Sequence, residues 1–147
     1  MRRVVGVLAV VLVAGCTSTT PLPRMSAADA DAAYEPLVAA VQKAVSDSVS
    51  GVVWNPVTPR YGSDTANRCV YQVGLVGGTW TGSPPLQHAP AELVAVVEAP
   101  ASAHGFRDVK GEIVQGATSV KARDAKGAEL TLFERPGSIG ISVNVGC

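Results

Sequence analysis

The chain has 147 residues, and its 12 lysines and arginines balance its 12 aspartates and glutamates. Beyond Arg2 and Arg3 it contains no run of basic residues. This distribution excludes the electrostatic footprint of a nucleic-acid-binding protein and gives no support for charge-driven attraction to anionic lipid. A chain of this length suits one domain with a hydrophobic core of its own.

The first sixteen residues, MRRVVGVLAVVLVAGC, predict a secretory signal peptide. Two arginines precede the apolar stretch Val4–Gly15, and small residues precede Cys16. Twelve helical residues extend about 18 Å, too little to cross a hydrocarbon core of roughly 30 Å. The ending Val13-Ala14-Gly15-Cys16 resembles the bacterial lipobox, in which the cysteine is lipidated and becomes the first residue of the processed chain. The alternative is an ordinary signal peptide followed by a chance cysteine.

This interpretation divides the chain into three parts. Residues 1–15 are the expected signal peptide, residues 16–25 a lipidated cysteine with a Thr/Pro-rich tether, and residues 26–147 a single domain. The expected location is the cell envelope, on the outer face of the cytoplasmic membrane, with the lipid on Cys16 as the membrane partner.

With Cys16 assigned to lipid, Cys69 and Cys147 remain. Export places them in an oxidising compartment, and two cysteines allow only one intramolecular pairing, so we expect a Cys69–Cys147 disulfide. The rival is a metal site, but two cysteines without a nearby histidine pair are a poor ligand set for zinc. We therefore expect no metal and no other cofactor.

The folded part is expected to begin with a helix. Ser26 stands three residues before Asp29, as in a capping box, and apolar residues then recur at spacings of three and four up to Val49. Gly51 provides a stop. Pro36 leaves two alternatives open: either one helix kinks there, or residues 26–35 form a separate turn and the main helix covers about 36–49.

The middle of the chain alternates between extended and loop-like patterns. Residues 52–54 predict a short extended piece and residues 56–67 a loop, because the latter are rich in proline, glycine, serine and aspartate. From Cys69 to Val76 the alternation predicts a central strand, with Tyr71, Val73 and Leu75 on one face. The glycine- and proline-rich segment 77–85 predicts a second loop.

The last third predicts a helix and then strands. A helix begins at Pro90, meets an interruption at Pro100 and ends by Gly105. Three strands follow at 117–123, 128–134 and 139–145, joined by glycine-containing turns. The expected fold class is α+β, a two-layer sandwich with two helices on one face of a mostly antiparallel sheet, in the order α-β-α-β-β-β.

A set of landmarks extends over nearly all of the expected processed chain. After the lipobox come Tyr34-Glu35, Trp54, Cys69, His104-Gly105-Phe106, the turn at 124–127 and a terminal Val145-Gly146-Cys147. In this order they resemble small actinobacterial lipoproteins, most of all the mycobacterial LppA type. The departure is that this chain stops at its cysteine. The family carries no assigned activity, so the resemblance implies location and architecture alone.

No catalytic motif is present, and we name no catalytic residue. His104 falls at an expected helix C-terminus, where carbonyl contacts explain a histidine. His88 is interpreted as a solvated loop residue. Asp124 is explained by its turn, because the spacing of Asp108, Glu112 and Asp124 does not match a calcium loop.

The aromatic residues offer a possible ligand or partner surface. Trp80 lies beside a glycine-flanked loop and is our candidate to line a groove, with Trp54, Tyr61 and His88 as further members. The alternative is that both tryptophans are core residues at the edge of the sheet, which is favoured for Trp54 and evenly balanced for Trp80.

Two functions of different classes follow. The favoured one is a non-enzymatic, membrane-anchored lipoprotein whose domain binds a protein, peptidoglycan or lipid partner, not yet identified, in the cell envelope. The alternative is a small lipid or ligand carrier, or a hydrolase, that uses the Trp80 loop and His88.

Overall fold

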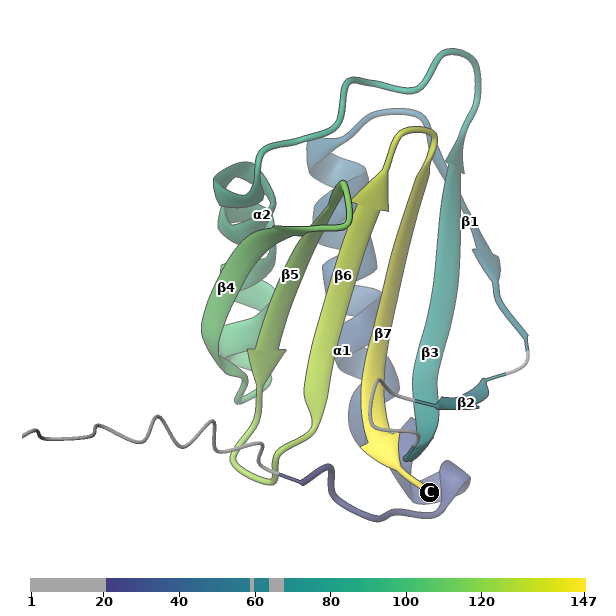
Figure 1. The fold of residues 1–147 in the computed structure, drawn as a ribbon, viewed down its shortest axis with the longest axis vertical. Helices are drawn as coiled ribbons and strands as arrows, with labels where there is room; N and C mark the ends of the chain where they lie inside the picture. The colour runs from purple at the N-terminus through teal and green to yellow at the C-terminus, as the bar shows by residue number, and fades with distance from the viewer. Residues whose placement is uncertain (1–20, 59, 64–67) are drawn as a thin grey trace, which may run out of the picture.

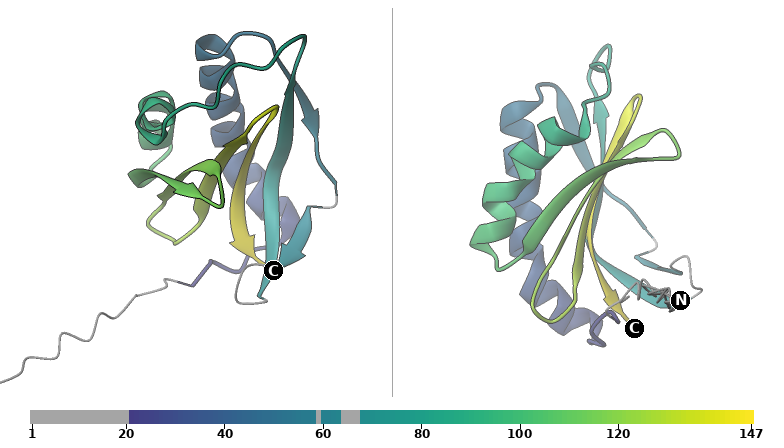
Figure 2. Two further views of the ribbon diagram at one scale, coloured as in Figure 1. Left: turned by 45° about the horizontal axis from the view of Figure 1, so that its top comes forward. Right: turned by 60° about the vertical axis from the view of Figure 1, so that its left-hand side comes forward.

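The computed structural model describes residues 21–58, 60–63 and 68–147. The signal peptide, Cys16 and the first part of the tether lie outside these residues. In the described part, two helices cover one face of a seven-stranded antiparallel sheet (Figures 1 and 2). The predicted α+β class and two-layer arrangement are confirmed.

The sheet has the order β1-β3-β7-β6-β5-β4, and β2 pairs with the start of β3 (Figure 1). The elements have these bounds: α1 Ala27–Ser48, β1 Val52–Pro56, β2 Tyr61–Ser63, β3 Cys69–Trp80, α2 Pro90–Ala103, β4 Arg107–Val114, β5 Ala117–Arg123, β6 Glu129–Arg135 and β7 Ser138–Gly146. Strands β4 to β7 follow one another as neighbours, whereas β3 crosses over to pair with β7.

Helix α1 is a single helix that contains Pro36, so the alternative of a separate first turn is excluded. Ser26 is the N-cap, and its hydroxyl accepts a hydrogen bond from the Asp29 backbone N–H at 3.2 Å, as predicted. Pro36 is tolerated because it and Ala32, whose carbonyl loses its helical partner, both lie on the exposed side where water reaches that carbonyl.

Strand β3 is longer than predicted, because Gly77 and Gly78 belong to it and not to a loop. Gly78 is buried opposite Trp54 of β1. A Cβ atom there would lie 2.6 Å from Ile139 Cγ2 and 2.8 Å from Val52 Cγ1. Close packing therefore requires glycine at this position, so a glycine in this segment does not have to indicate a loop.

A bulge in β3 changes which side chains face the helices. The register with β7 shifts between Val73 and Val76, and Gly74 has a φ of +57°. Before the bulge Tyr71 and Val73 face the helices, and after it the alternation reverses. The prediction that Leu75 shares a face with Val73 is wrong for this reason.

Three further elements, two strands and a helix, differ from the sequence-based expectation. β2 lies within the predicted loop 56–67, and β4 was not among the three strands predicted after the second helix. The residues of β4 are almost all exposed, so its sequence lacks a period-two apolar pattern. Helix α2 continues through Pro100 to Ala103, and Gly105 follows with a φ of +81°.

The core lies between the sheet and the helices and is filled by aliphatic side chains together with the aromatic rings of Tyr34, Tyr71 and Phe106. A Cys69–Cys147 disulfide, with Cα atoms 5.4 Å apart, joins the start of β3 to the residue after β7, as predicted. The N-terminal segment reaches the same end of the sheet, where Arg24 forms an isolated parallel bridge with Gly146.

Candidate functional site

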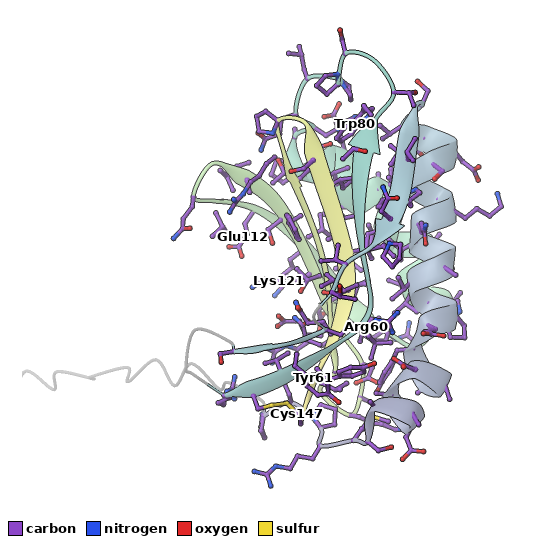
Figure 3. All side chains as sticks on the ribbon, turned by 90° about the vertical axis from the view of Figure 1, so that its right-hand side faces the viewer. Arg60, Tyr61, Trp80, Glu112, Lys121 and Cys147 are labelled. Atoms are coloured by element: carbon purple, nitrogen blue, oxygen red, sulfur yellow. A yellow bond between two sulfur atoms is a disulfide. The ribbon has the colours of Figure 1, made fainter. Side chains whose placement is uncertain are left out.

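The face of the sheet opposite the helices, called here the open face, is concave and bears polar side chains over one half, whereas Val114 and Phe133 are exposed on the other half. Figures 2 and 3 show the sheet twisting so that its β4–β5 end and its β2–β3 end both bend away from the helices. In Figure 3, Glu112 and Lys121 project on this side, away from α1. Directly opposed residues of antiparallel strands share a face, so the strand register identifies the side chains that gather there.

Two rows of polar side chains cross the open face. One row runs over β5, β6, β7 and β3 and consists of Arg123, Glu129, Asn144 and Gln72. The next row runs over β4, β5, β6 and β7 and consists of Lys110, Lys121, Thr131 and Ser142. Four neighbouring strands extend about 14 Å, the length of a disaccharide or a short peptide.

Hydrogen bonds organise part of these rows. Arg123 donates to Glu129 Oε2 from Nε at 3.2 Å and from Nη2 at 2.9 Å. Ser142 Oγ donates to Asn144 Oδ1 at 3.3 Å. These contacts orient the side chains near the middle of the face before any ligand arrives.

Three hollows follow the rows across the open face and its lower rim. A hollow of about 520 Å³ lies over β4 and β5, and one of about 270 Å³ lies toward β2 and β3; the two share Lys121, Arg123 and Glu129. A third, of about 570 Å³, shares Asp108 and Arg123 with the first. The shared residues place the three hollows next to one another, and we call them together the trough.

Two lysines in this trough are unusual. Lys110 and Lys121 are directly opposed on β4 and β5, and like charges in that position destabilise a sheet. Neither has a hydrogen-bond or ion-pair partner among the residues that the structure describes. The trough therefore offers two free ammonium groups beside the carboxylates of Glu112 and Glu129, a donor set for a ligand that carries both charges.

The sequence-predicted tryptophans lie on the other face, under the helices. Trp54 is half-buried, and its Nε1 donates to Ser46 Oγ of α1 at 2.8 Å. Trp80 also packs against the core, and its Nε1 is buried without a hydrogen-bond partner in the described part of the chain. The core interpretation therefore holds for both side chains.

His88 is not a solvated loop residue. Its backbone N–H donates to Glu134 Oε1 at 2.6 Å, and its Nδ1 lies 2.7 Å from Glu134 Oε2. The Glu134 side chain is 2 % exposed and that of His88 24 %. Thr118 donates its hydroxyl to the His88 carbonyl at 2.7 Å, so this pair fastens the segment before α2 to the ends of β5 and β6.

A histidine on a buried carboxylate also occurs in general-base catalysis, where the second ring nitrogen faces a hydroxyl nucleophile. Among the described hydrogen bonds, none joins His88 Nε2 to a serine or threonine hydroxyl. The hydrogen bonds that the structure describes for His88 fasten it to Glu134 and Thr118, and we call this arrangement the clamp.

Tyr61 lies at the opposite end of the molecule from Trp80 (Figure 3). It pairs with Tyr71, nine residues before Trp80 on β3, which corresponds to about 30 Å. The two tyrosine rings are 4.9 Å apart, and Tyr61 is 57 % exposed. The four candidates Trp54, Tyr61, Trp80 and His88 therefore do not form one site.

Beside Tyr61, a polar cluster joins β2 and β3 to α1. The Tyr71 hydroxyl donates to Asp31 at 2.9 Å, and Arg60 lies 3.5 Å from both Asp31 and Glu35. Burial, with a contribution from the Asp31 carboxylate, raises the pKa of the Tyr71 hydroxyl above its ordinary value. This cluster closes the lower edge of the core.

Two polar residues have the roles that the sequence predicted. His104 is the C-cap of α2, with Nδ1 2.9 Å from the Pro100 carbonyl oxygen. Asp124 Oδ1 accepts hydrogen bonds from the N–H groups of Lys126 and Ala128, both at 2.9 Å, which closes the β5–β6 turn. Among the residues described, no three histidine, cysteine or acidic side chains gather closely enough to hold a metal ion.

The sequence reasoning missed the open face because its members are separated along the chain and are ordinary surface residues one by one. A partial signal existed in β5, β6 and β7, where polar residues at positions 121, 123, 129, 131, 142 and 144 alternate with apolar ones. That alternation identifies a polar face, but the strand order decides which residues become neighbours.

Comparisons with known proteins leave the family of this chain open. No family model matches it, and no curated protein matches it. Among solved structures, the crystal structure of a DUF4853 family protein from Actinomyces odontolyticus ATCC 17982 is similar, with a TM-score of 0.45 and 13% identity. The similarity covers 84% of this chain and 69% of that chain. Neither helix in the described part is long and apolar enough to cross a membrane.

Proposed function

We propose that this protein is an exported lipoprotein, anchored through Cys16, whose domain binds a polar polymer of the cell envelope on the open face of its sheet. The observation that carries the proposal is the trough lined by free lysines, carboxylates and amide side chains. The ligand class that fits is peptidoglycan, because its stem peptides bear carboxylates and amines and its sugars bear hydroxyl and amide groups.

The favoured class is binding rather than carriage of an apolar ligand. A carrier needs an apolar cavity of several hundred cubic ångströms. In this protein the space between sheet and helices is filled by side chains such as Leu37, Leu130 and Ile141, each fully buried. The hollows described above open on the polar face instead.

Co-sedimentation with purified, insoluble peptidoglycan tests the ligand. Protein purified from membranes in detergent should sediment with it, and binding should weaken as salt rises, because charge pairs contribute. Failure to sediment at low salt would show that peptidoglycan is not the ligand.

Variants test the surface. Lys121→Ala removes a free cation from the centre of the trough and should weaken binding roughly 10-fold or more, as expected for the loss of a charge-assisted hydrogen bond. The matched control is Lys43→Ala, because Lys43 is exposed on α1 in the other layer and pairs only with Asp47. Equal losses in both variants, or none in either, would reject the open face as the site.

A further inference from the structure

The open edge of the sheet leads to an inference that is independent of the proposed ligand. β4 is the last strand in the sheet order, and no described strand pairs with its outer edge. Such an edge presents unpaired backbone N–H and C=O groups and is a template for another strand. We propose that the partner is a second copy of this chain, paired antiparallel with β4 through a two-fold axis beside Gly111.

The turn that follows β4 decides which backbone groups point outward. Gln115 and Gly116 have φ values of +49° and +79° and form a two-residue hairpin turn between Val114 and Ala117. In such a hairpin the two residues that flank the turn, Val114 and Ala117, exchange two backbone hydrogen bonds, and every second residue pair along the two strands does the same. The even-numbered residues of β4 therefore bond to β5.

The odd-numbered residues Gly111 and Ile113 consequently direct their N–H and C=O groups to the free edge. A two-fold axis beside Gly111 pairs each residue before Gly111 in one copy with the residue equally far after Gly111 in the other copy. Gly111 then faces Gly111 of the second copy, and Val109 faces Ile113. Gly111 and Ile113 lie in the regular part of the β4–β5 ladder, so their outward-pointing groups agree with the proposed register. Val109 lies within the register shift between Arg107 and Lys110, so it contributes its side chain to the pairing and not a regular hydrogen-bonded pair.

The same register makes the side chains complementary. Lys110 of each copy stands opposite Glu112 of the other, on the open face, which gives two ion pairs across the axis. These pairs also offset the repulsion between Lys110 and Lys121. On the helix-bearing face, Ile113 is 58 % exposed and would be covered by Val109 of the second copy.

Helix α2 leaves room for this partner near the axis. Its first turns lie over β4, since a Cβ atom at Gly111 would lie 2.8 Å from Pro90 Cβ and 2.9 Å from Val94 Cγ2. In the dimer, the first turns of α2 of the second copy would lie beside the first turns of α2 of the first copy. Ala91 and Ala95 of these turns are exposed and are small enough for a close helix–helix approach.

The pairing also merges the two troughs. The 520 Å³ hollow is lined by Lys110 and Glu112 and therefore borders the axis. A dimer of this kind forms a continuous fourteen-stranded sheet, with both open faces on the same side. Because β4 runs in opposite directions in the two copies, their N-terminal segments leave from opposite ends of the dimer. Two anchored copies would thus lie along the membrane.

Charge reversal and its restoration test the proposal. The probe is the protein purified from membranes in detergent, measured by sedimentation velocity up to about 200 micromolar, where a small interface is populated. The wild type should self-associate to a dimer. Lys110→Glu alone and Glu112→Lys alone each oppose like charges, and each should weaken dimerisation roughly 10-fold.

The double variant Lys110→Glu with Glu112→Lys should restore the dimer, which a nonspecific or micelle-driven association would not do. Ile113→Lys, on the face that does not line the trough, should abolish dimerisation while leaving peptidoglycan binding by the monomer in place, so the two proposals fail separately. A monomeric wild type, or a dimer that the single reversals leave unchanged, would overturn the inference.

Discussion

At the scale of single residues, the most consequential polar contact is the one between His88 and Glu134. The carboxylate of Glu134, almost completely buried, accepts a hydrogen bond from the backbone N–H of His88 and lies 2.7 Å from Nδ1 of the same residue. Removing either partner leaves a buried polar group unsatisfied, which costs more than the net value of the hydrogen bond itself.

We expect Glu134→Leu and His88→Ala each to lower the free energy of unfolding by about 2–3 kcal/mol. The double variant should cost clearly less than the sum of the two, because both changes remove the same interaction. Urea denaturation measures all three values. Additive losses would contradict the clamp.

Tyr34 predicts a dependence of stability on alkaline pH. Its hydroxyl donates to Asp124 Oδ2 at 2.8 Å, and burial together with this carboxylate raises the pKa of Tyr34 well above its ordinary value. The raised pKa stabilises the folded state fully below about pH 10, the ordinary tyrosine value, and this contribution is lost as pH rises further toward the folded-state pKa.

The melting temperature should therefore fall as pH rises above about 10, and Tyr34→Phe should make this decline shallower. Thermal unfolding of both proteins at each pH provides the measurement, and Tyr61→Phe, at an exposed position, is the matched control. Parallel declines in wild type and Tyr34→Phe would show that Tyr34 contributes nothing to it.

At the scale of elements, β3 is the strand on which the architecture depends. It pairs with β1, β2 and β7, and its bulge reverses the direction of its side chains halfway along. Odd-numbered residues face the helices before the bulge and even-numbered residues face them after it. Tyr71 near one end of β3 and Trp80 at the other end therefore both lie on the helix-covered face.

Gly78→Ala should destabilise the domain by about 1–3 kcal/mol, because the added methyl group meets Ile139 and Val52 in a packed layer. Gly62→Ala is the control, since a Cβ atom at Gly62 has its nearest neighbour, Gln72 Oε1, at 3.9 Å. Chemical denaturation compares the two. A neutral Gly78→Ala would mean that this layer rearranges freely.

The disulfide links the first residue of β3 with the residue after β7, at a sequence separation of 78. Replacing both Cys69 and Cys147 with serine should lower the free energy of unfolding by about 4 kcal/mol, the chain-entropy value for a loop of this length. The intact mass of the untreated protein should be two units below that of the reduced protein. A thiol that reacts without denaturant at either cysteine would contradict the pairing.

At the scale of the whole molecule, one end of the sheet collects the N-terminal segment, the disulfide and the C-terminus. Residue 21, the first that the structure describes, belongs to this end. Four residues lie between it and Cys16, and the five steps from Cys16 to residue 21 extend at most about 17 Å, so the proposed anchor would hold this end close to the membrane. With this proposed anchor, the trough on the open face would lie within the envelope layer next to the membrane.

Blocking lipoprotein signal peptidase with globomycin should cause the unprocessed precursor to accumulate, because processing at Cys16 requires prior lipidation. Cys16→Ala should release or mislocalise the protein. Immunoblotting of membrane and soluble fractions measures both effects, and Cys69→Ala, outside the lipobox, is the control. A globomycin-insensitive chain that remains in the membrane fraction as Cys16→Ala would refute the anchor.

The sequence by itself determined the properties that depend on near neighbours. The cap at Ser26, the turn at Asp124, the apolar stripe of α1 and the alternation in β5, β6 and β7 are local patterns, and together they were sufficient for the α+β class and for both helices. The Cys69–Cys147 pairing also followed, because only one pairing was available once Cys16 was assigned to lipid.

The tertiary structure alone decided what depends on register and on distant contacts. Gly77 and Gly78 have the composition of a loop, yet Trp54, Val52 and Ile139 pack against this segment and hold it in β3. Strand β4 has no apolar alternation of its own and exists because it pairs with β5. The open face likewise arises from strand order, since Gln72, Asn144, Glu129 and Arg123 become one row only when β3, β7, β6 and β5 lie side by side.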